Sequence, residues 1–224
     1  MGEAAESESS TALRRWESPG QQPRSHATQA AFLDAAEALF SSSGIEATSV
    51  NDVAKQARRS IGSLYHHFQK KEILVLAVVD RILGDLDRVT ELRLRPSHTK
   101  DLGIPDIVGD YVQTALSIER GRPGYKRILI EVGLGDPQTR SAYKRFRQRL
   151  DGGLIALLLE RRSEIGHSDP EMAARFVVDQ LSAMLWARLD RVMTPTQLEN
   201  HGDADFMAEA LASVSAYLKL GQEG

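Results

Sequence analysis

A compact group of basic, aromatic and hydroxyl side chains lies within residues 57–72, ARRSIGSLYHHFQKKE. Arginine and lysine attract phosphate groups, while tyrosine and histidine add hydrogen-bonding groups and flat rings that can meet bases. No acidic residue occurs between Val53 and Lys71, although the whole chain carries a formal net charge of -3. The stretch therefore predicts a locally positive surface suited to the phosphates and base edges of a nucleic acid.

Helix signals before this group predict short helices that would position it. We expect Thr28 to be the N-cap of a first helix that Gly44 ends. Ser49 stands three residues before Asp52, which is close to a capping box with Asp in place of Glu. Val50, Val53, Ala54 and Ala57 then recur at helical spacing and predict a second helix after this box.

A third short helix is predicted over residues 60–68, with Ser60 as its N-cap. Leu64 and Phe68 lie four residues apart, so both should face a small core. Only residues 57–59 separate this helix from the one before it. That arrangement is typical of a helix-turn-helix, whose later helix enters the major groove of DNA.

The outer face of the third helix has the composition of a DNA-facing surface. Small residues near its start, Gly62 and Ser63, allow its backbone to approach the double helix closely. Tyr65 and the two histidines after it supply hydrogen-bonding groups. Lys71 stands near the start of the next helix, where its charge and the helix dipole both favour a phosphate group.

The segment GIEATSVNDVAKQARRSIGSLYHHFQKKEIL resembles the DNA-binding segment of TetR/AcrR-type transcriptional regulators. In that family the pattern runs roughly G-x-x-x-T-[ST]-V-x-x-I-A-x-x-A-G-V-S-x-G-[ST]-[LF]-Y-x-[HY]-F-x-x-K-x-x-L. The resemblance covers residues 27–76. The matching residues are Gly44, Thr48, Ser49, Val50, Val53 (for Ile), Ala54, Ala57, Ser60, Gly62, Ser63, Leu64, Tyr65, His67, Phe68, Lys71 and Leu74.

The resemblance implies a homodimer that binds a near-palindromic operator in double-stranded DNA. Its two recognition helices would meet successive major grooves, about 34 to 36 Å apart. The residues facing DNA from the recognition helix would be Ser60, Ile61, Gly62, Ser63 and Tyr65, with Ile61 touching thymine methyl groups. Phosphate contacts that fix the register would come from Ser49, His66, His67 and Lys71.

This chain departs from the family pattern in the turn, where the usual Gly and Val are Arg58 and Arg59. Glycine normally relieves backbone strain at that position. Arg58 must therefore adopt a strained conformation at some cost, or the turn must differ. Arg59 replaces an apolar core residue, but its stem can still cover apolar surface while its guanidinium reaches a phosphate. Both substitutions add positive charge, so we expect both residues to belong to the DNA-binding surface.

Two other interpretations of the recognition helix are open. Tyr65 can be a core side chain rather than a DNA contact. His66 and His67 can be metal ligands, but adjacent helical residues point about 100° apart and no HExxH-type partner exists. We therefore expect no metal site.

Helical periodicity continues to the C-terminus and predicts an all-α fold of about nine helices, with no strand pattern and no internal repeat. We expect a disordered polar tail over residues 1–24, a helix-turn-helix domain over 25–71 and a helical effector-binding and dimerisation domain over 72–224. After a long helix over 71–95, the remaining helices are predicted over residues 106–120, 126–134, 139–165, 170–192 and 204–220.

The resemblance also implies a pocket for a small apolar or amphipathic effector, and dimerisation through the last two long helices. Candidate pocket residues combine apolar area with some polar or polarisable capacity. They are Tyr111, Tyr143, Met184 and Trp186. Candidate dimer residues are Phe176, Leu181, Leu185, Leu211, Val214 and Leu218. Plain core packing would produce the same pattern at most of these positions.

Composition and missing motifs exclude several classes of protein. The 224 residues are 42% hydrophobic and 26% charged, and they include no cysteine, so disulfides and thiolate chemistry are excluded. No apolar run approaches the roughly 18 to 20 residues that span a bilayer, and the polar N-terminus lacks a secretory signal. We therefore expect a cytoplasmic protein that does not contact membranes.

No catalytic motif or cofactor fingerprint is present, so we expect neither an enzyme nor a cofactor. The main rival is a DNA-binding regulator or architectural protein without a small ligand. A basic run, with Arg140, Lys144, Arg145, Arg147 and Arg149, predicts a solvated helix face. A second surface for DNA or an acidic ligand is the alternative for that run.

Overall fold

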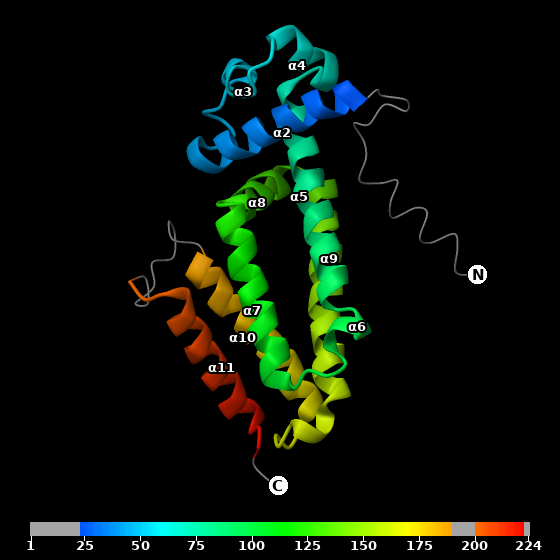
Figure 1. Cartoon of the computed structure of the whole chain (residues 1–224), viewed down its shortest axis with the longest axis vertical. Helices are drawn as coiled ribbons and strands as arrows, with labels where there is room; N and C mark the ends of the chain where they lie inside the picture. Colours follow the sequence, from blue (N-terminus) through cyan, green and yellow to red (C-terminus); the bar gives the residue numbers. More distant parts are fainter. Residues whose placement is uncertain (1–22, 190–199, 222–224) are drawn as a thin grey trace, which may run out of the picture. The chain divides into compact units, whose positions relative to one another are not determined.

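The computed structural model describes residues 23–189 and 200–221. Within these ranges the chain forms ten α-helices, one 3-10 turn and no strand, which confirms the all-α prediction (Figure 1). The elements are α2 (Pro23–Ser43), α3 (Val50–Gln56), α4 (Ile61–Phe68), α5 (Lys71–Arg93), α6 (Pro96–Thr99), α7 (Ile104–Gly121), α8 (Tyr125–Gly135), α9 (Pro137–Glu160), η1 (Arg162–Glu164), α10 (Pro170–Leu189) and α11 (Asp203–Leu218).

The predicted helix boundaries that differ most from the structure are the start of the first helix and the end of the helix over 139–165. The first helix begins at Pro23, so Thr28 lies inside α2 and is not its N-cap. Apart from residues 23 and 24, the predicted tail lies outside the described residues. The predicted helix over 139–165 ends instead at Glu160, and η1 follows. The Arg161 side chain donates to the carbonyl of Leu157 at 3.0 Å, which satisfies an otherwise open group in the last turn.

The chain divides into two compact units that differ from the predicted domains. Of the described residues, unit 1 comprises those up to Arg88 together with Gly124–Phe146, and unit 2 comprises Val89–Pro123 together with those from Arg147 onward. The predicted boundary after Lys71 does not coincide with this division. The first part of α5 is fully buried at Leu74 and Ile82, and its Arg81 forms ion pairs with α2, so this part of α5 belongs to unit 1.

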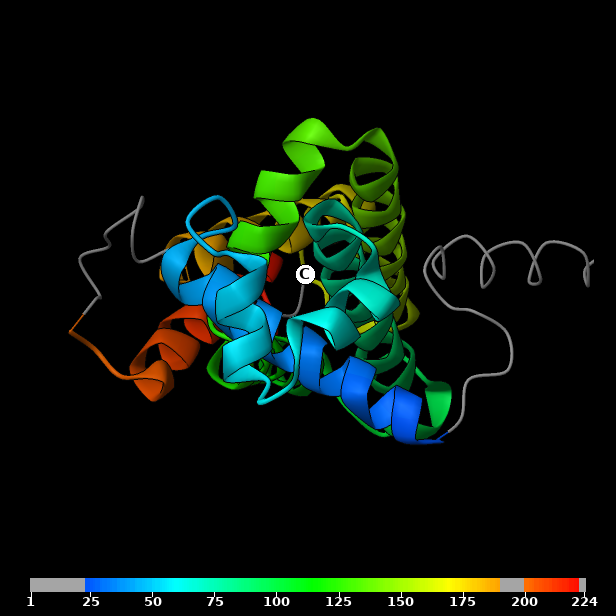
Figure 2. The ribbon, with the colours of Figure 1, turned by 90° about the horizontal axis from the view of Figure 1, so that it is seen from above.

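Unit 1 is built on α2, which packs against α3, α4 and α8. Figure 2 shows α3 and α4 beside α2. Phe32 on α2 and Phe68 on α4 are fully buried, with their ring centroids 6.3 Å apart in an edge-to-face arrangement. Arg81 on α5 forms ion pairs with Asp34 and Glu37 on α2, each at 2.6 Å. These contacts fix the helix-turn-helix on a rigid support.

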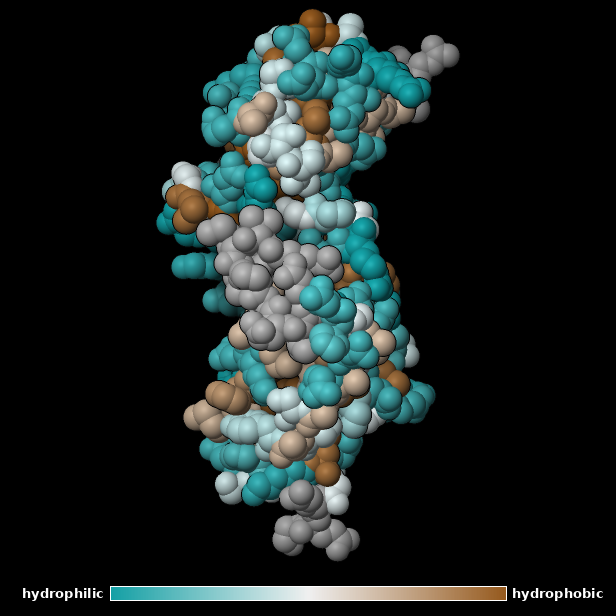
Figure 3. Space-filling view, turned by 90° about the vertical axis from the view of Figure 1, so that its left-hand side faces the viewer, coloured by the Kyte–Doolittle hydropathy of each residue, from teal (hydrophilic) through white to brown (hydrophobic). Residues whose placement is uncertain are grey.

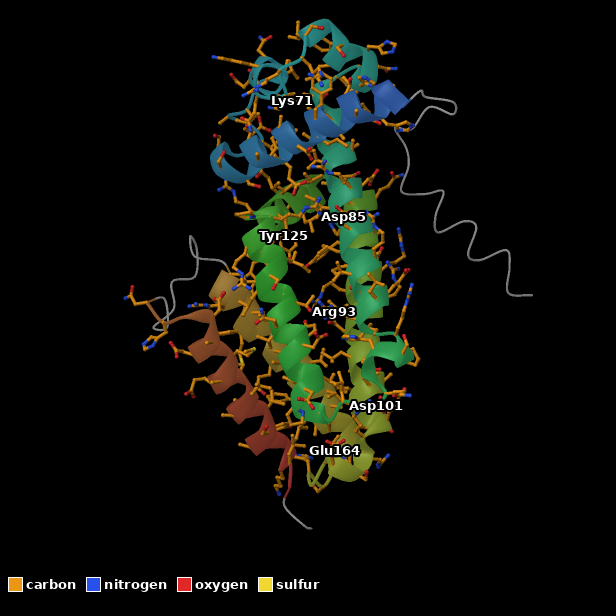
Figure 4. The ribbon with its side chains drawn as sticks, in the orientation of Figure 1. Lys71, Asp85, Arg93, Asp101, Tyr125 and Glu164 are labelled. Atoms are coloured by element: carbon orange, nitrogen blue, oxygen red, sulfur yellow. The ribbon has the colours of Figure 1, made fainter. Side chains whose placement is uncertain are left out.

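In unit 2, α7, α10 and α11 pack against one another in pairs (Figure 1). Their core includes Val108, Leu181 and Val214, all at most 1% exposed. Glu164 of η1 accepts a hydrogen bond from the backbone N–H of Ile104 at 3.1 Å and so caps the start of α7 (Figure 4). Unit 2 is therefore a helical bundle with its own core.

Candidate nucleic-acid interface

The start of α3 is held by the capping box that the sequence predicts. Ser49 Oγ accepts from the backbone N–H of Asp52 at 3.2 Å, and the Asp52 carboxylate accepts from the backbone N–H of Ser49 at 3.1 Å. The hydrogen bonds from Ser49 lower the pKa of Asp52. Because the Ser49 hydroxyl also donates to Asp52 at 2.5 Å, its predicted phosphate contact would have to replace that bond.

The turn after α3 keeps its regular geometry although its glycine is replaced. Arg58 adopts the left-handed conformation, with φ 54°. The N–H of Arg58 donates to the carbonyl of Lys55 at 3.1 Å, and the N–H of Arg59 donates to that of Ala54 at 3.0 Å. This pair of bonds is the Schellman motif that ends many helices. Of the two alternatives for this turn, the strained arginine is therefore correct.

Replacing Arg58 by glycine should stabilise the protein, because glycine adopts the left-handed conformation without strain. We expect a gain of about 1 kcal/mol in the free energy of unfolding, measured by urea titration. Arg58→Ala keeps the strain and removes the same charge, so it should show no comparable gain. Equal stability of the two variants would contradict the assignment of strain to Arg58.

The predicted recognition helix α4 separates a buried face from an exposed one. Ser60 caps it by accepting from the N–H of Ser63 at 3.1 Å. Leu64 and Phe68 are fully buried, as the sequence predicts. Tyr65 is 46% exposed, which excludes its interpretation as a core side chain. The exposed residues of the helix are Ile61, Gly62, Tyr65 and His66.

The two histidines have different surroundings. His66 is exposed, whereas His67 is half-buried, with its ring 6.1 Å from that of Phe32. Burial, and secondarily the neighbouring His66, lowers the pKa of His67. Its Nδ1 is buried and has no hydrogen-bond partner among the described residues. Burial therefore favours the neutral form of His67, whereas contact with a phosphate would favour the charged form.

The lowered pKa of His67 makes stability depend on pH. The unfolded chain takes up the proton near the ordinary pKa of 6.5, before the folded protein does. The contribution of neutral His67 to stability is therefore complete above that pH and is lost as the pH falls through the folded-state pKa. We expect the urea midpoint of the wild type to fall between pH 7.5 and 5.5 by more than that of His67→Gln. Parallel pH profiles would contradict this assignment.

Lys71 is the first residue of α5 and lies close to the loop between α2 and α3 (Figure 4). Its Nζ donates to the carbonyl of Glu46 at 3.4 Å, a long bond that leaves two ammonium N–H groups unused. Arg58, Arg59 and Lys70 are exposed beside the same helix-turn-helix, so with Lys71 the ends of α4 are flanked by positive side chains. Positive side chains beside an exposed helix are the groups that contact DNA phosphates.

Comparison with known proteins identifies the family. Residues 32–78 match the model of bacterial regulatory proteins of the tetR family, and residues 104–218 match the tetracyclin repressor-like C-terminal domain. The chain belongs to the TetR family. Its matched domains and named relatives are transcriptional regulators, which agrees with the expectation that it is not an enzyme.

Individual TetR-family relatives are distant. The regulator UidR of Escherichia coli K12 is 30% identical over 127 residues, which are 55% of this chain and 60% of UidR. The chain thus spans about three fifths of the length of this curated relative. The repressor KstR2 of Rhodococcus jostii is 46% identical over 55 residues, 25% of this chain and 27% of KstR2.

Solved structures of TetR-family proteins share the fold. A regulator from Mesorhizobium loti has a TM-score of 0.68 and 22% identity, and the match covers 88% of this chain and 98% of that one. A SmeT–triclosan complex has a TM-score of 0.58 and 19% identity, with 85% and 90% covered. At these identities the likeness concerns the fold alone.

The four candidate effector-pocket residues are divided between the units. Tyr111 and Met184 are half-buried against the core of unit 2, and Trp186 is 39% exposed on α10. Tyr143 belongs to unit 1, where its ring lies 6.1 Å from that of Phe146. Their assembly into one TetR-type pocket remains a prediction.

Four of the predicted dimer residues belong instead to the core of the single chain. Leu181, Leu185, Val214 and Leu218 are at most 3% exposed, so they offer no surface to a second TetR-family subunit. Periodicity marked them as apolar but did not show which apolar face meets the chain's own core. Phe176 is 51% exposed and Leu211 is half-buried, so these two remain dimer candidates. Figure 3 shows apolar side chains among hydrophilic ones on the α11 side of unit 2.

Two arginines of the basic run form hydrogen bonds within the protein, so they are not simply exposed to solvent. Arg140 donates to the carbonyls of Gly133 at 2.9 Å and Leu134 at 2.7 Å, and so satisfies the C-terminus of α8. Arg147 is half-buried in unit 2, where it contacts Asp151 and donates to Ser182. Lys144 and Arg145 are exposed, as a solvated face requires.

Sequence reasoning missed the polar group formed by Arg147, Asp151 and Ser182. It joins α9 to α10, with Arg147 Nη2 2.8 Å from Asp151 Oδ1 and 2.7 Å from Ser182 Oγ. Burial raises the pKa of Asp151, against the opposing effect of Arg147. The spacing of Arg147 and Asp151, four residues apart, is the sequence signal that could have indicated an ion pair within the helix.

Two searches of residues 23–189 and 200–221 gave negative results. No group of three or more metal-ligating side chains is close enough to hold an ion. In the same part of the chain, no helix is both long and apolar enough to cross a bilayer.

Proposed function

We propose that this protein is a homodimeric, cytoplasmic repressor that binds a near-palindromic operator and leaves it when a small apolar or amphipathic effector binds. The observation that carries the proposal is the exposed face of α4, supported on a buried core and preceded by an intact turn. The relatives named above are DNA-binding regulators, which supports the same function.

In the proposed complex, the first turn of α4 lies in the major groove. The small residues Gly62 and Ser63 allow the helix backbone to approach the groove, while Ile61 and Tyr65 contact the base edges. Arg58, Arg59 and Lys71 contact phosphates on the flanking strands. The phosphate contacts supply affinity and register, and the residues of α4 supply sequence preference.

Release by an effector requires a connection between the two units. The helices α5 and α9 contribute residues to both units, so a change in unit 2 can reach the helix-turn-helix through continuous helices. The effector must bind the non-operator form more tightly, because equal affinity for both forms shifts nothing. Reducing the operator-binding population from about 99% to about 1% takes roughly 5.5 kcal/mol of differential affinity. The SmeT–triclosan complex shows that a protein of this fold can hold a small molecule.

For the dimer, we propose a surface on α10 that includes Met172 and Phe176, with Leu211 of α11. Met172 and Phe176 are exposed large apolar side chains, and their burial in a second subunit would remove that apolar area from water. Phe176→Glu should therefore shift the protein toward monomers in analytical ultracentrifugation. An unchanged dimer mass would place the interface elsewhere.

The phosphate-contact part of the proposal is tested by a salt series. Binding of the full-length protein to an operator duplex is followed by fluorescence anisotropy from about 50 to 200 mM salt. In a homodimer, Lys71 contacts one phosphate in each of the two half-sites. Lys71→Ala should therefore reduce the slope of log affinity against log salt by about 2 in magnitude. Lys100→Ala, which removes an exposed lysine of unit 2, should leave the slope unchanged. Identical slopes for wild type and Lys71→Ala would contradict the proposed phosphate contact.

A further inference from the structure

The recognition helix carries an unusual set of side chains for reading bases. Residues 61–68, IGSLYHHF, include no arginine, lysine, asparagine, glutamine, aspartate or glutamate. Arginine and lysine make the commonest specific contacts to guanine, and asparagine or glutamine makes the paired contact to adenine. Without them, α4 has only single hydrogen-bonding groups, such as the Tyr65 hydroxyl and the His66 ring, to offer the base edges.

Ile61 is the large apolar side chain at the start of this helix. It is 39% exposed, whereas the neighbouring branched aliphatic residues of unit 1, Val53 and Leu64, are at most 1% exposed. It is the first residue of α4, and residues at the N-terminal end of a recognition helix are those that reach base edges. Ile61 does not contribute to the buried face of α4, which is formed by Leu64 and Phe68. Its position is therefore not explained by packing in the core of unit 1.

The surroundings of Ile61 favour direct apolar contact. Gly62 follows it, and apart from its two chain neighbours and the backbone of α4, no atom of the described chain lies within 4 Å of the point where a Cβ on Gly62 would stand. The surface beside Ile61 is therefore open, and the helix backbone can approach the groove floor. The major groove presents one apolar group, the C5 methyl group of thymine.

We propose that Ile61 is a specificity-determining residue that reads thymine methyl groups, so that A·T pairs rather than guanines occupy the operator positions under the start of α4. This inference rests on the proposed function. Burying one methyl-sized group contributes about 0.8 kcal/mol, which corresponds to about a fourfold change in affinity. Because a homodimer meets two half-sites, the change should exceed about tenfold when both contacted thymines lose their methyl groups.

The test begins with selection of an operator from a random duplex pool by the full-length protein. Each thymine of the selected half-site is then replaced symmetrically by deoxyuridine, which lacks only the C5 methyl group, and Kd is measured by anisotropy. For the wild type we expect one or two thymine positions at which uracil weakens binding by about tenfold or more. Ile61→Ala should bind the thymine and uracil duplexes equally well. Leu134→Ala, which removes an exposed leucine of α8 in the same unit, should keep the wild-type preference.

The remaining outcomes separate the inference from the function on which it rests. A selected operator whose uracil and thymine forms bind equally overturns the inference and leaves the repressor function intact. A uracil effect of the same size in Ile61→Ala also overturns it, because the methyl group would then act through DNA shape. If no sequence is enriched, the proposed function fails, and the inference fails with it.

Discussion

Replacing Phe68 by alanine should lower the free energy of unfolding by about 3–5 kcal/mol and abolish operator binding at the same time. Phe68 is fully buried on α4, and its ring meets that of Phe32 on α2 edge to face. Removing a buried phenylalanine costs both the transfer free energy of the ring and the cavity it leaves. Because α4 is only eight residues long, it has little stability apart from this packing.

Tyr65→Ala provides the matched comparison for Phe68→Ala. It removes an aromatic ring from the same helix, but from the exposed face. We expect Tyr65→Ala to weaken operator binding while leaving the free energy of unfolding within about 0.5 kcal/mol of the wild type. Urea titration and anisotropy on the same samples measure both quantities. A Phe68→Ala protein with wild-type stability would show that α4 is not anchored by this core.

Gly62 should show the second large effect, with stability and binding changing in opposite directions. Gly62 is the second residue of α4, and a Cβ at this position would meet no atom within 4 Å in the described chain, apart from its chain neighbours and the helix backbone. The fold itself therefore has no need for glycine here, and glycine inside a helix costs about 0.5–1 kcal/mol relative to alanine. Because Gly62 lies in the first turn of α4 rather than in its middle, Gly62→Ala should stabilise the protein by at most that amount.

For DNA the absence of a side chain at Gly62 matters, because it lets the helix backbone approach the groove. Gly62→Leu keeps a good helix former but adds bulk on the DNA-facing side. We expect it to weaken operator binding about a hundredfold, which corresponds to about 2.7 kcal/mol shared between two half-sites. Ser141→Leu, on an exposed position of α9 in the same unit, is the control for added bulk. Wild-type affinity of Gly62→Leu would place the DNA on another face of the protein.

The local signals in residues 44–71 predicted the helix-turn-helix well. The capping box of Ser49 and Asp52, the cap at Ser60 and the buried pair of Leu64 and Phe68 all appear as expected. These features depend on side chains a few residues apart, so a short stretch of sequence contains the information. For the turn, the missing glycine left two alternatives open, and the structure has the strained Arg58.

Features that depend on distant residues were predicted poorly. Leu181 and Val214 have the spacing of an apolar face, but spacing alone does not distinguish the chain's own core from a subunit interface. Arg147 looked solvated because its contact with Ser182, from another helix, is not encoded locally. The inclusion of the first part of α5 in unit 1 depends similarly on the contacts of Arg81 with Asp34 and Glu37 on α2.

The central claim, that the exposed face of α4 reads a particular DNA sequence, is tested most directly by one ratio. Kd is measured by fluorescence anisotropy for the selected operator and for a scrambled duplex of equal length and composition, at the same salt concentration. We predict that the operator binds at least about a thousandfold more tightly, and that Tyr65→Ala combined with Lys71→Ala removes most of this difference. Equal affinity for the two duplexes would contradict the claim.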